Sequence, residues 1–330
     1  MADAARVAGL RGRLAARVPE RRHVVVTAMP VTAFLVLLAA LAVASPALLE
    51  TGSLLTLADS AAPLTVLAAG ATVVVLCGGI DLSVAALASL ASVLLASWVP
   101  ALSGAAVPAV VAACAVAGAV QGLVHVAFRI PSFVVTLGGM TLWSAVALLA
   151  SGAATVPMPD STPTDWAFTR LGGLVPSAVL VALATVVALA ALMRFTPLGR
   201  WVRAIGHAEP AARLAGLPIA RVKVIAFALS GATAGLAGAL LVARTFSGAP
   251  TLADSLLLPA VAAIVVGGTA ITGGHGALWR TLVGAGIVTL LRVGLSYAGV
   301  DAAYESILYG VLIVGAVALT IDRSKLSIVK

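Results

Sequence analysis

The sequence predicts an all-α membrane protein that crosses the bilayer about ten times and has both termini in the cytoplasm. Two observations predict this fold class. Charged residues make up only 10% of the chain and hydrophobic residues 62%, with a mean hydropathy of +1.15, whereas a soluble domain averages about 25% charged residues. The apolar residues also gather in runs close to the roughly 20 residues that a helix needs to span hydrocarbon.

The apolar runs define the predicted spans, at about residues 24–44, 61–78, 83–99, 105–127, 131–150, 174–193, 224–244, 257–272, 280–298 and 304–321. The first run is longer than the 7–15-residue core of a signal peptide, so we expect it to be retained as a span. The eighth run is short and contains Gly267 and Gly268, which predicts a tilted, broken or partial span.

The basic residues set the expected orientation, because Lys and Arg concentrate in the cytoplasmic segments of membrane proteins. With the N-terminus inside, most of the 20 Lys and Arg residues fall in cytoplasmic segments, and an odd number of spans would scramble that segregation. The expected organisation is a basic tail (1–23), a transmembrane domain (24–322) and a short C-terminal tail (323–330). The external segment Ser151–Gly173 is expected to be irregular, and is either a contact for an extracytoplasmic partner or a plain connector.

The loop 194–223 is the only long polar interruption of the apolar chain. It contains a predicted short helix from Ala211 to Ala215, which follows Pro210 at the first helical position and ends at Gly216 in a left-handed conformation. A helix this short is marginal on its own, so we expect it to dock into a second protein on the cytoplasmic side. The basic residues of the loop are Arg194, Arg200, Arg203, Arg213, Arg221 and Lys223, and its single acid is Glu209.

The sequence contains no set of residues typical of an enzyme. It lacks a Walker phosphate loop, a metal-spaced His/Cys cluster and a nucleophile elbow, so no catalysis, metal or cofactor is predicted. Cys77 and Cys114 lie in apolar runs, as buried thiols do. Ionisable groups near or inside the spans are scarce, with Asp81, His125 and Arg292 as the main examples. Because an ion-coupled carrier usually places several such groups in its spans, the scarcity favours a passive conduit that another subunit opens.

A few polar residues are candidates for a substrate pathway. Asp81, together with Ser83, either caps the third span or has a gating or substrate role, and the two roles are compatible. Ser132 and Thr136 lie four residues apart on the fifth span, where their hydroxyls either face a polar path or bond back to the preceding turn.

Arg292 is the least expected residue in the apolar runs. Its distance from Thr281 predicts a position near the middle of the bilayer, where an unpaired charge costs at least about 2.5 kcal/mol. We expect its side chain to face the interior and pair with Asp301, Glu305 or Asp254. The alternative is a side chain that extends toward the outer surface.

Four stretches together resemble one known family. They are VVVLCGGIDLSVAAL (73–87), IPSFVVTLGGMTLWSAVALLASG (130–152), TPLGRWVRAIGHAEPAARLAGLPIARVK (196–223) and AAIVVGGTAITGGHGALWRTLVGA (262–285). Their combination and spacing resemble the ribose/xylose-type permease subunits of bacterial ABC importers. The resemblance covers residues from about 55 to 322, and the pairing of GGIDLS with the polar loop is its most specific part.

The resemblance implies a type II ABC importer-like bundle in the bacterial inner (plasma) membrane. It implies a second permease subunit, identical or different, as well as cytoplasmic ATP-binding subunits and an extracytoplasmic solute-binding protein. The segment Ala204–Gly216 would then contain the coupling helix that enters a groove on the ATPase. The implied ATPase-coupling residues are Ala204, Gly206, His207, Glu209, Ala212, Arg213 and Gly216. The pathway candidates are Asp81, Ser83, Ser132, Phe133, Thr136 and Arg292.

Three positions depart from the family pattern. Residues 257–262 are apolar where the family often has an acidic pair, and Arg292 stands where the family tends to have an uncharged polar residue. Pro210 replaces a helix-forming residue, so the coupling helix is expected to begin one residue later. The first two changes touch the expected conduit and leave the substrate open.

The expected function is therefore that of an ABC importer permease which moves a sugar or sugar-like solute inward by alternating access, driven by a separate ATPase. Within that class, a nucleoside or autoinducer-type solute is an alternative. Outside it, the alternatives are an ion-coupled secondary carrier, whose transport would survive loss of an ATPase, and a membrane scaffold that transports nothing. The basic residues occur as short clusters between apolar runs, so no nucleic-acid partner is predicted.

Overall fold

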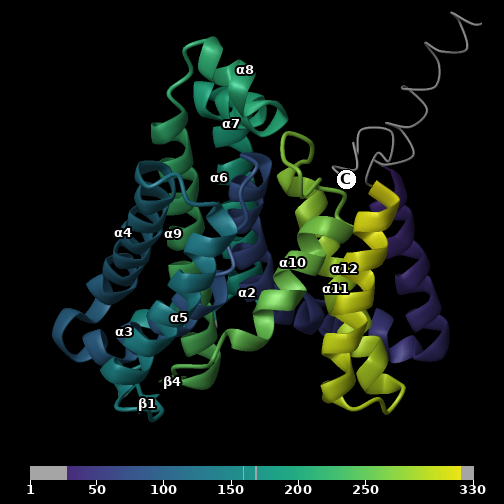
Figure 1. Ribbon diagram of the computed structural model, residues 1–330. Coiled ribbons are helices and arrows are strands. Elements are labelled where there is room, and N and C mark those ends of the chain that lie inside the picture. Colours follow the sequence, from purple (N-terminus) through teal and green to yellow (C-terminus); the bar gives the residue numbers. More distant parts are fainter. Residues whose placement is uncertain (1–27, 159, 168, 321–330) are drawn as a thin grey trace, which may run out of the picture.

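The computed structural model describes residues 28–158, 160–167 and 169–320, and this part of the chain is mostly helical (Figure 1). The predicted terminal tails, 1–23 and 323–330, lie outside the described residues. By length and composition, six helices in the described ranges can cross a membrane, and shorter apolar helices accompany them. These helices support the expected polytopic membrane protein.

Each predicted apolar run contains a helix. The helices, in chain order, are Ala28–Ala44, η1 (Pro46–Leu49), α2 (Thr51–Leu76), α3 (Val84–Leu102), η2 (Ser103–Ala105), α4 (Ala106–Ala127), α5 (Ser132–Ser151), η3 (Thr162–Ala167), α6 (Ser177–Phe195), α7 (Pro197–His207), α8 (Glu209–Leu214), α9 (Ile219–Thr245), η4 (Asp254–Leu256), α10 (Leu257–Val266), α11 (Leu278–Tyr297), η5 (Ala302–Tyr304) and α12 (Glu305–Thr320). The η elements are short 3₁₀ helices.

Two helices differ from their predicted ranges. Helix α2 begins at Thr51, well before residue 61. Asp59 therefore lies on the helix and not in a loop, and its carboxylate is 3.7 Å from the guanidinium of Arg244. Helix α10 has only 10 residues and ends at Gly267, so the eighth apolar run forms a short helix followed by the irregular segment 267–277.

Helix α9 lies at the centre of the main bundle and packs against α2, α3 and α4. Its contact with α4 depends on small residues. A Cβ atom added to Gly231 would fall on the carbonyl oxygen of Cys114, and one added to Gly118 would fall on that of Phe227. The two backbones therefore touch along this seam, as the glycines and alanines in residues 231–238 predict.

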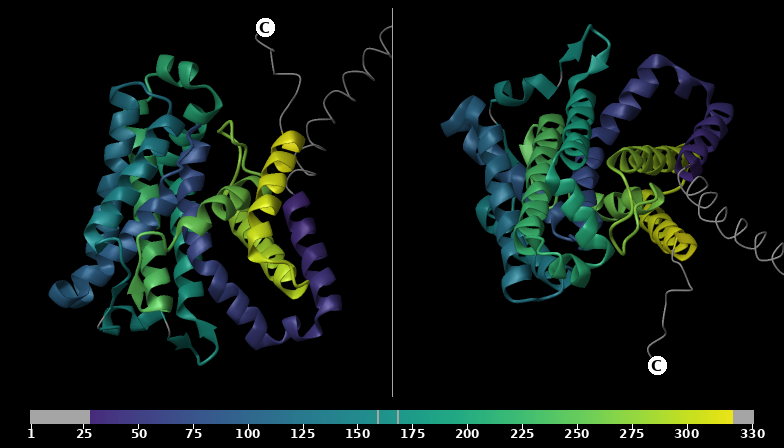
Figure 2. Two further views of the ribbon diagram at one scale, coloured as in Figure 1. Left: turned by 60° about the horizontal axis from the view of Figure 1, so that its bottom comes forward. Right: turned by 90° about the horizontal axis from the view of Figure 1, so that it is seen from above.

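A second group of helices stands beside this bundle. It contains α10, α11 and α12, with the helix Ala28–Ala44 against α11 (Figures 1 and 2). Gly284 on α11 lies against the carbonyl of Ala263 on α10, which holds these two helices in close contact. The groups are joined where Thr72 on α2 and Thr281 on α11 share a buried hydrogen bond of 2.8 Å.

The two ends of the molecule differ in character. Helices α7 and α8 form one end, and short strands form the other (Figure 1). Strand β1 (Val156–Pro157) pairs antiparallel with β4 (Ser247–Gly248), and β2 (Arg170–Leu171) pairs antiparallel with β3 (Val175–Pro176). Ser89 on α3 bonds to both the Asp254 carboxylate and the amide of Ala253, which fastens the segment after β4 to the bundle.

Candidate functional site

Helix α7 is an amphipathic helix that the sequence analysis missed. It begins after Thr196 with Pro197 in its first turn, a typical helix start, and ends at His207. Its buried face contains Val202 and Ile205, which pack with the end of α2 and the start of α9. The signal was present in the sequence, because its apolar residues recur at helical spacing.

Helix α8 is the predicted short helix, displaced by about two residues. It runs from Glu209 to Leu214, with Pro210 in its first turn, so the expected later start is wrong. Proline fits there because first-turn amides have no intrahelical acceptor. Gly216 adopts the expected left-handed conformation, with φ +75°. Ala212 is buried against the bundle, whereas the Leu214 side chain is 92% exposed, which leaves an apolar side chain pointing away from the protein.

Glu209 anchors α8 to the bundle. Its Oε2 accepts a 2.7 Å hydrogen bond from Lys223 at the start of α9, and its Oε1 accepts one of 2.8 Å from Arg213. Partial burial raises the pKa of the Glu209 carboxyl, but the bonds and charges of Lys223 and Arg213 outweigh it and hold that pKa below its ordinary value. Glu209 is therefore ionised at neutral pH and paired with both cations.

The anchor continues into α4 through His125. The Lys223 ammonium lies 3.2 Å from Nε2 of His125, and Nδ1 of His125 lies 2.6 Å from the carbonyl oxygen of Ile130. A carbonyl oxygen only accepts, so Nδ1 donates and Nε2 is the acceptor for Lys223. A chain of polar contacts thus joins α8 to the start of α9 and the end of α4.

A junction of glycines joins α7 to the bundle on its other side. A Cβ atom at Gly206 would overlap the carbonyl oxygen of Leu76 at the end of α2. That same carbonyl accepts a 3.0 Å hydrogen bond from the amide of Gly274, in the segment after α10. Nearby, the rings of His207 and His275 are in contact, with their centroids 4.2 Å apart and their planes tilted by 31°. These contacts persist only if three segments move together: helix α7, the end of α2 and the segment 267–277.

A buried polar cluster lies at the break between α2 and α3. The Asp81 carboxylate accepts bonds from the backbone amide and hydroxyl of Ser83, at 3.0 and 2.6 Å, and from the hydroxyl of Ser230 on α9, at 2.8 Å. The predicted capping is only partly right, because Asp81 bonds to the residue that precedes α3 and not to the first-turn amides. Its second oxygen instead connects the break to α9.

Gln121 completes this cluster, and the sequence analysis identified neither it nor Ser230. The Gln121 amide donates to the Ser83 hydroxyl at 2.9 Å. Gly139 on α5 leaves the space that its carbonyl group occupies. The only signal for Gln121 was a lone amide in an apolar run, and nothing in the sequence indicated that it meets Asp81.

The other pathway candidates separate into two places. Ser132 and Thr136 on α5 bond to the backbone amide and carbonyl of Ile80, at 3.0 and 3.1 Å, and so fix the break from the side. The Phe133 side chain points outward and is 50% exposed. Of the predicted pathway residues, Asp81 and Ser83 are the two that belong to the buried cluster.

Arg292 lies apart from these residues. Its Nε is 3.6 Å from a carboxylate oxygen of Glu305 at the start of α12, so Glu305 is the acid that pairs with it among the three proposed. The expectation that Arg292 faces the interior is wrong for the single chain, because its side chain is 62% exposed. Helix α11 turns this position outward, and within the described residues the acid that pairs with it comes from the neighbouring α12.

These features define a class of protein. Apolar helices long enough to span a membrane surround the buried polar cluster at the break between α2 and α3. At one end of the molecule, the short helix α8 is anchored to the bundle, as expected of a polytopic membrane permease. Residues 53–317 match the family described as branched-chain amino acid transport system / permease component, and the chain belongs to this family of transport permeases.

Among curated proteins, the chain is similar to sugar importers. It is 34% identical over 305 residues to the ribose import permease protein RbsC of Bacillus subtilis, covering 90% of this chain and 92% of that protein. It is 33% identical to the protein of the same name from Escherichia coli K12, covering 89% and 92%. The fructose import permease protein FrcC of Rhizobium meliloti is 33% identical over 267 residues, covering 77% and 73%. No solved structure matches the chain.

Proposed function

We propose that this chain is the membrane permease subunit of an ABC importer for a sugar or sugar-like solute, in the inner membrane of a bacterium. The relatives that cover most of its length import ribose or fructose, which favours a sugar over the amino acids in the family description. The proposed arrangement has ten membrane-crossing segments with both termini in the cytoplasm, as the distribution of basic residues favours.

The observation that supports this function best is the construction of α8. A six-residue helix is too short to be stable on its own, and its Leu214, 92% exposed, gains little from burial against the bundle. Here Glu209 ties it to Lys223, whose side chain is only 14% exposed. The helix therefore presents Leu214 and Arg213 outward from a fixed base. We propose that an ATP-binding subunit receives this face in a groove, with Ala204, Gly206, His207, Glu209, Ala212 and Gly216 positioning it.

The same contacts suggest how movement of α8 reaches the membrane. Glu209 and Lys223 lead to α9 and to His125 on α4, and Gly206 leads to the end of α2. Helices α2, α4 and α9 all contribute to the region around the polar break. A rigid displacement of α7 and α8 would thus act on Asp81 and Ser83, with Ser132 and Thr136 holding Ile80, and shift the balance between inward-open and outward-open states.

The partners follow from the class of transporter. A permease with no nucleotide site of its own needs a separate ATPase, and an importer of this kind receives solute from an extracytoplasmic binding protein. A second permease subunit would complete the conduit. The exposed side chains of Phe133 and of Arg292, which pairs with Glu305, are candidates for the surfaces that face it or the solute.

Uptake of labelled ribose and fructose by cells that contain the whole transporter tests the proposal. Leu214→Asp and Gly216→Val are expected to abolish uptake and co-purification of the ATPase, while the permease still inserts in the membrane. Leu171→Asp, an exposed leucine at the opposite end, is the matched control for ATPase co-purification. Normal uptake and co-purification by both the Leu214→Asp and the Gly216→Val variant would refute the docking role. Uptake that persists without the ATPase would favour an ion-coupled carrier.

A further inference from the structure

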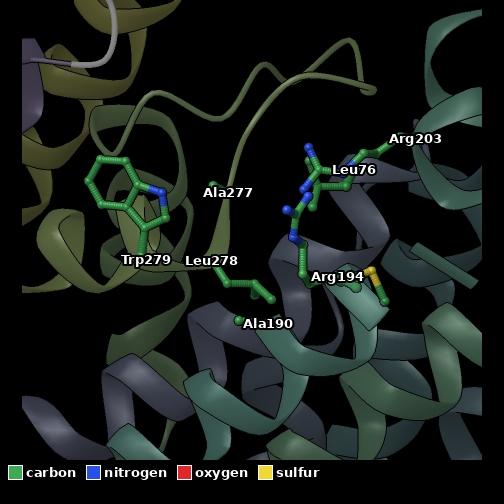
Figure 3. Close-up of a pocket in the computed structure, with 8 residues that line it drawn as sticks. Leu76, Ala190, Arg194, Arg203, Ala277, Leu278 and Trp279 are labelled. Atoms are coloured by element: carbon green, nitrogen blue, oxygen red, sulfur yellow. The ribbon is translucent and has the colours of Figure 1, made fainter. Parts of the chain in front are cut away.

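A cavity of about 240 Å³ opens beside α7 and is not used by the proposed coupling contacts. It lies between the ends of α2 and α6, helix α7 and the start of α11. Its floor is apolar, with Leu76, Ala190, Met193 and Leu278. Figure 3 shows the side chains of Arg194 and Arg203 together on one side of the cavity and Trp279 on the other.

The charges around this cavity have one sign. Among the described residues that line it, Arg194 and Arg203 are charged and none is acidic. One guanidinium nitrogen of Arg203 donates to the carbonyl of Gly276 at 3.3 Å, which fixes the direction of the side chain and leaves other N–H groups available. Arg280 stacks over the ring of Trp279, 5.5 Å from its centroid, and adds a third positive charge beside the cavity.

We propose that this cavity binds a phosphate group, and that its physiological source is the head group of an anionic phospholipid. Arginine suits this role because its planar fork of N–H donors matches phosphate oxygens in pairs. Because the two arginines lie together on one side of the cavity, a single anion bound there would contact both guanidinium groups. Basic pockets between helices at the cytoplasmic face are a known form of lipid head-group site.

The surface below the cavity favours a lipid over a free anion. Arg194 and Ala190 lie on α6, and the next residues on the same face are Val187, 64% exposed, and Leu183, 39% exposed. This spacing places an apolar stripe along the helix from the cavity toward the membrane core. Trp279 is 44% exposed at the rim, as is typical of aromatic side chains at head-group level. An acyl chain fits the stripe, and its phosphate fits the arginines.

Native mass spectrometry of the purified full-length chain tests the site. The probes are phosphatidylglycerol, phosphatidylcholine with the same acyl chains, and inorganic phosphate. The wild type is expected to retain phosphatidylglycerol in preference to phosphatidylcholine. At roughly 1 kcal/mol for each basic residue, the variant with both Arg194→Gln and Arg203→Gln should bind it about 30-fold more weakly. Each single variant should show part of that loss. Arg200 is exposed on α7, the helix that carries Arg203, but lies outside the cavity, so Arg200→Gln should show no loss.

The outcomes separate the two sources of phosphate. Preference for phosphatidylglycerol that the double variant loses supports a lipid site. Saturable binding of inorganic phosphate that the double variant loses, with no preference between the lipids, supports the phosphate site and reassigns it to a free anion. Equal binding of all probes by the wild type and the double variant overturns the proposal, as does an equal loss in Arg200→Gln. The measurement needs no ATPase, so it is independent of the docking role of α8.

Discussion

Replacing Glu209 with glutamine should loosen α8 while leaving the rest of the bundle folded. The exchange removes the negative charge that Lys223 contacts at 2.7 Å, and that lysine side chain is only 14% exposed. A hydrogen bond to a charged group is worth about 1.5–3 kcal/mol when its partner cannot turn to water. The second partner, Arg213, is 66% exposed, and such an i,i+4 pair contributes only about 0.3–0.5 kcal/mol. The expected cost is thus about 2 kcal/mol, almost all of it through Lys223.

Hydrogen exchange at the backbone of α8 measures this cost directly. The amides of Ala212 and Ala215 donate to the carbonyls of Ala208 and Ala211, so they exchange only when the helix opens. A loss of about 2 kcal/mol predicts exchange about 30-fold faster in Glu209→Gln. The matched control Arg213→Gln removes only the exposed partner and should change exchange by about twofold. Equal acceleration in the two variants, or none in Glu209→Gln, would refute the anchoring by Lys223.

The pH dependence of the same exchange has a defined sign. Burial raises the pKa of Glu209, but Lys223 and Arg213 more than compensate, so the folded-state pKa lies below the ordinary value of 4.5. A carboxyl with a lowered pKa stabilises the folded state fully above its ordinary value, and the contribution disappears as the pH falls through the lower folded value. Protection of α8, corrected for intrinsic rates, should be constant from pH 7 to about 5.5 and decline below about 4.5.

Two further predictions concern the junction and the polar cluster. Gly206→Val should lower the thermal stability of the purified protein by several degrees, because its side chain overlaps the Leu76 carbonyl, whereas Gly138→Ala, with open space around its Cβ, should lower it little or raise it. Asp81→Ala should destabilise the protein by about 3 kcal/mol or more, since it leaves three buried donors from Ser83 and Ser230 without an acceptor. Chemical denaturation of the purified variants measures both changes. Ser230→Ala should lower the free energy of unfolding by only about 1 kcal/mol, and equal effects of Asp81→Ala and Ser230→Ala would contradict the central position of Asp81.

Local signals in the sequence predict much of this fold. Apolar runs locate the helices, because a segment that spans hydrocarbon has to bond its own backbone. Pro210 and Gly216 locate α8 to within about two residues, since each fits few positions in a helix. The small residues of 231–238 predict the close contact of α9 with a neighbouring helix. These features depend only on residues that are near one another in the chain.

Contacts between distant segments could not be predicted in the same way. Gln121 and Ser230 meet Asp81 because three helices converge, and a single sequence does not encode that pairing in any local pattern. The start of α2 is not predictable from the sequence, because Asp59 resembles a loop residue until its partner Arg244 is known. The outward position of Arg292 depends on the rotation of α11 within the second group. Helix α7 is different, because the helical spacing of its apolar residues is a local signal, although basic residues surround it.

The proposed function requires that α8 docks into an ATPase subunit, and site-directed cross-linking tests this contact most directly. Leu214→Cys places an exposed thiol on α8, while the natural Cys77 and Cys114 are buried. In the assembled transporter, a short thiol-to-amine reagent should join residue 214 to the ATP-binding subunit, and Leu171→Cys at the opposite end should not be joined to it. Cross-links to the ATPase from residue 171 but not from residue 214 would contradict the proposed orientation and the docking role of α8.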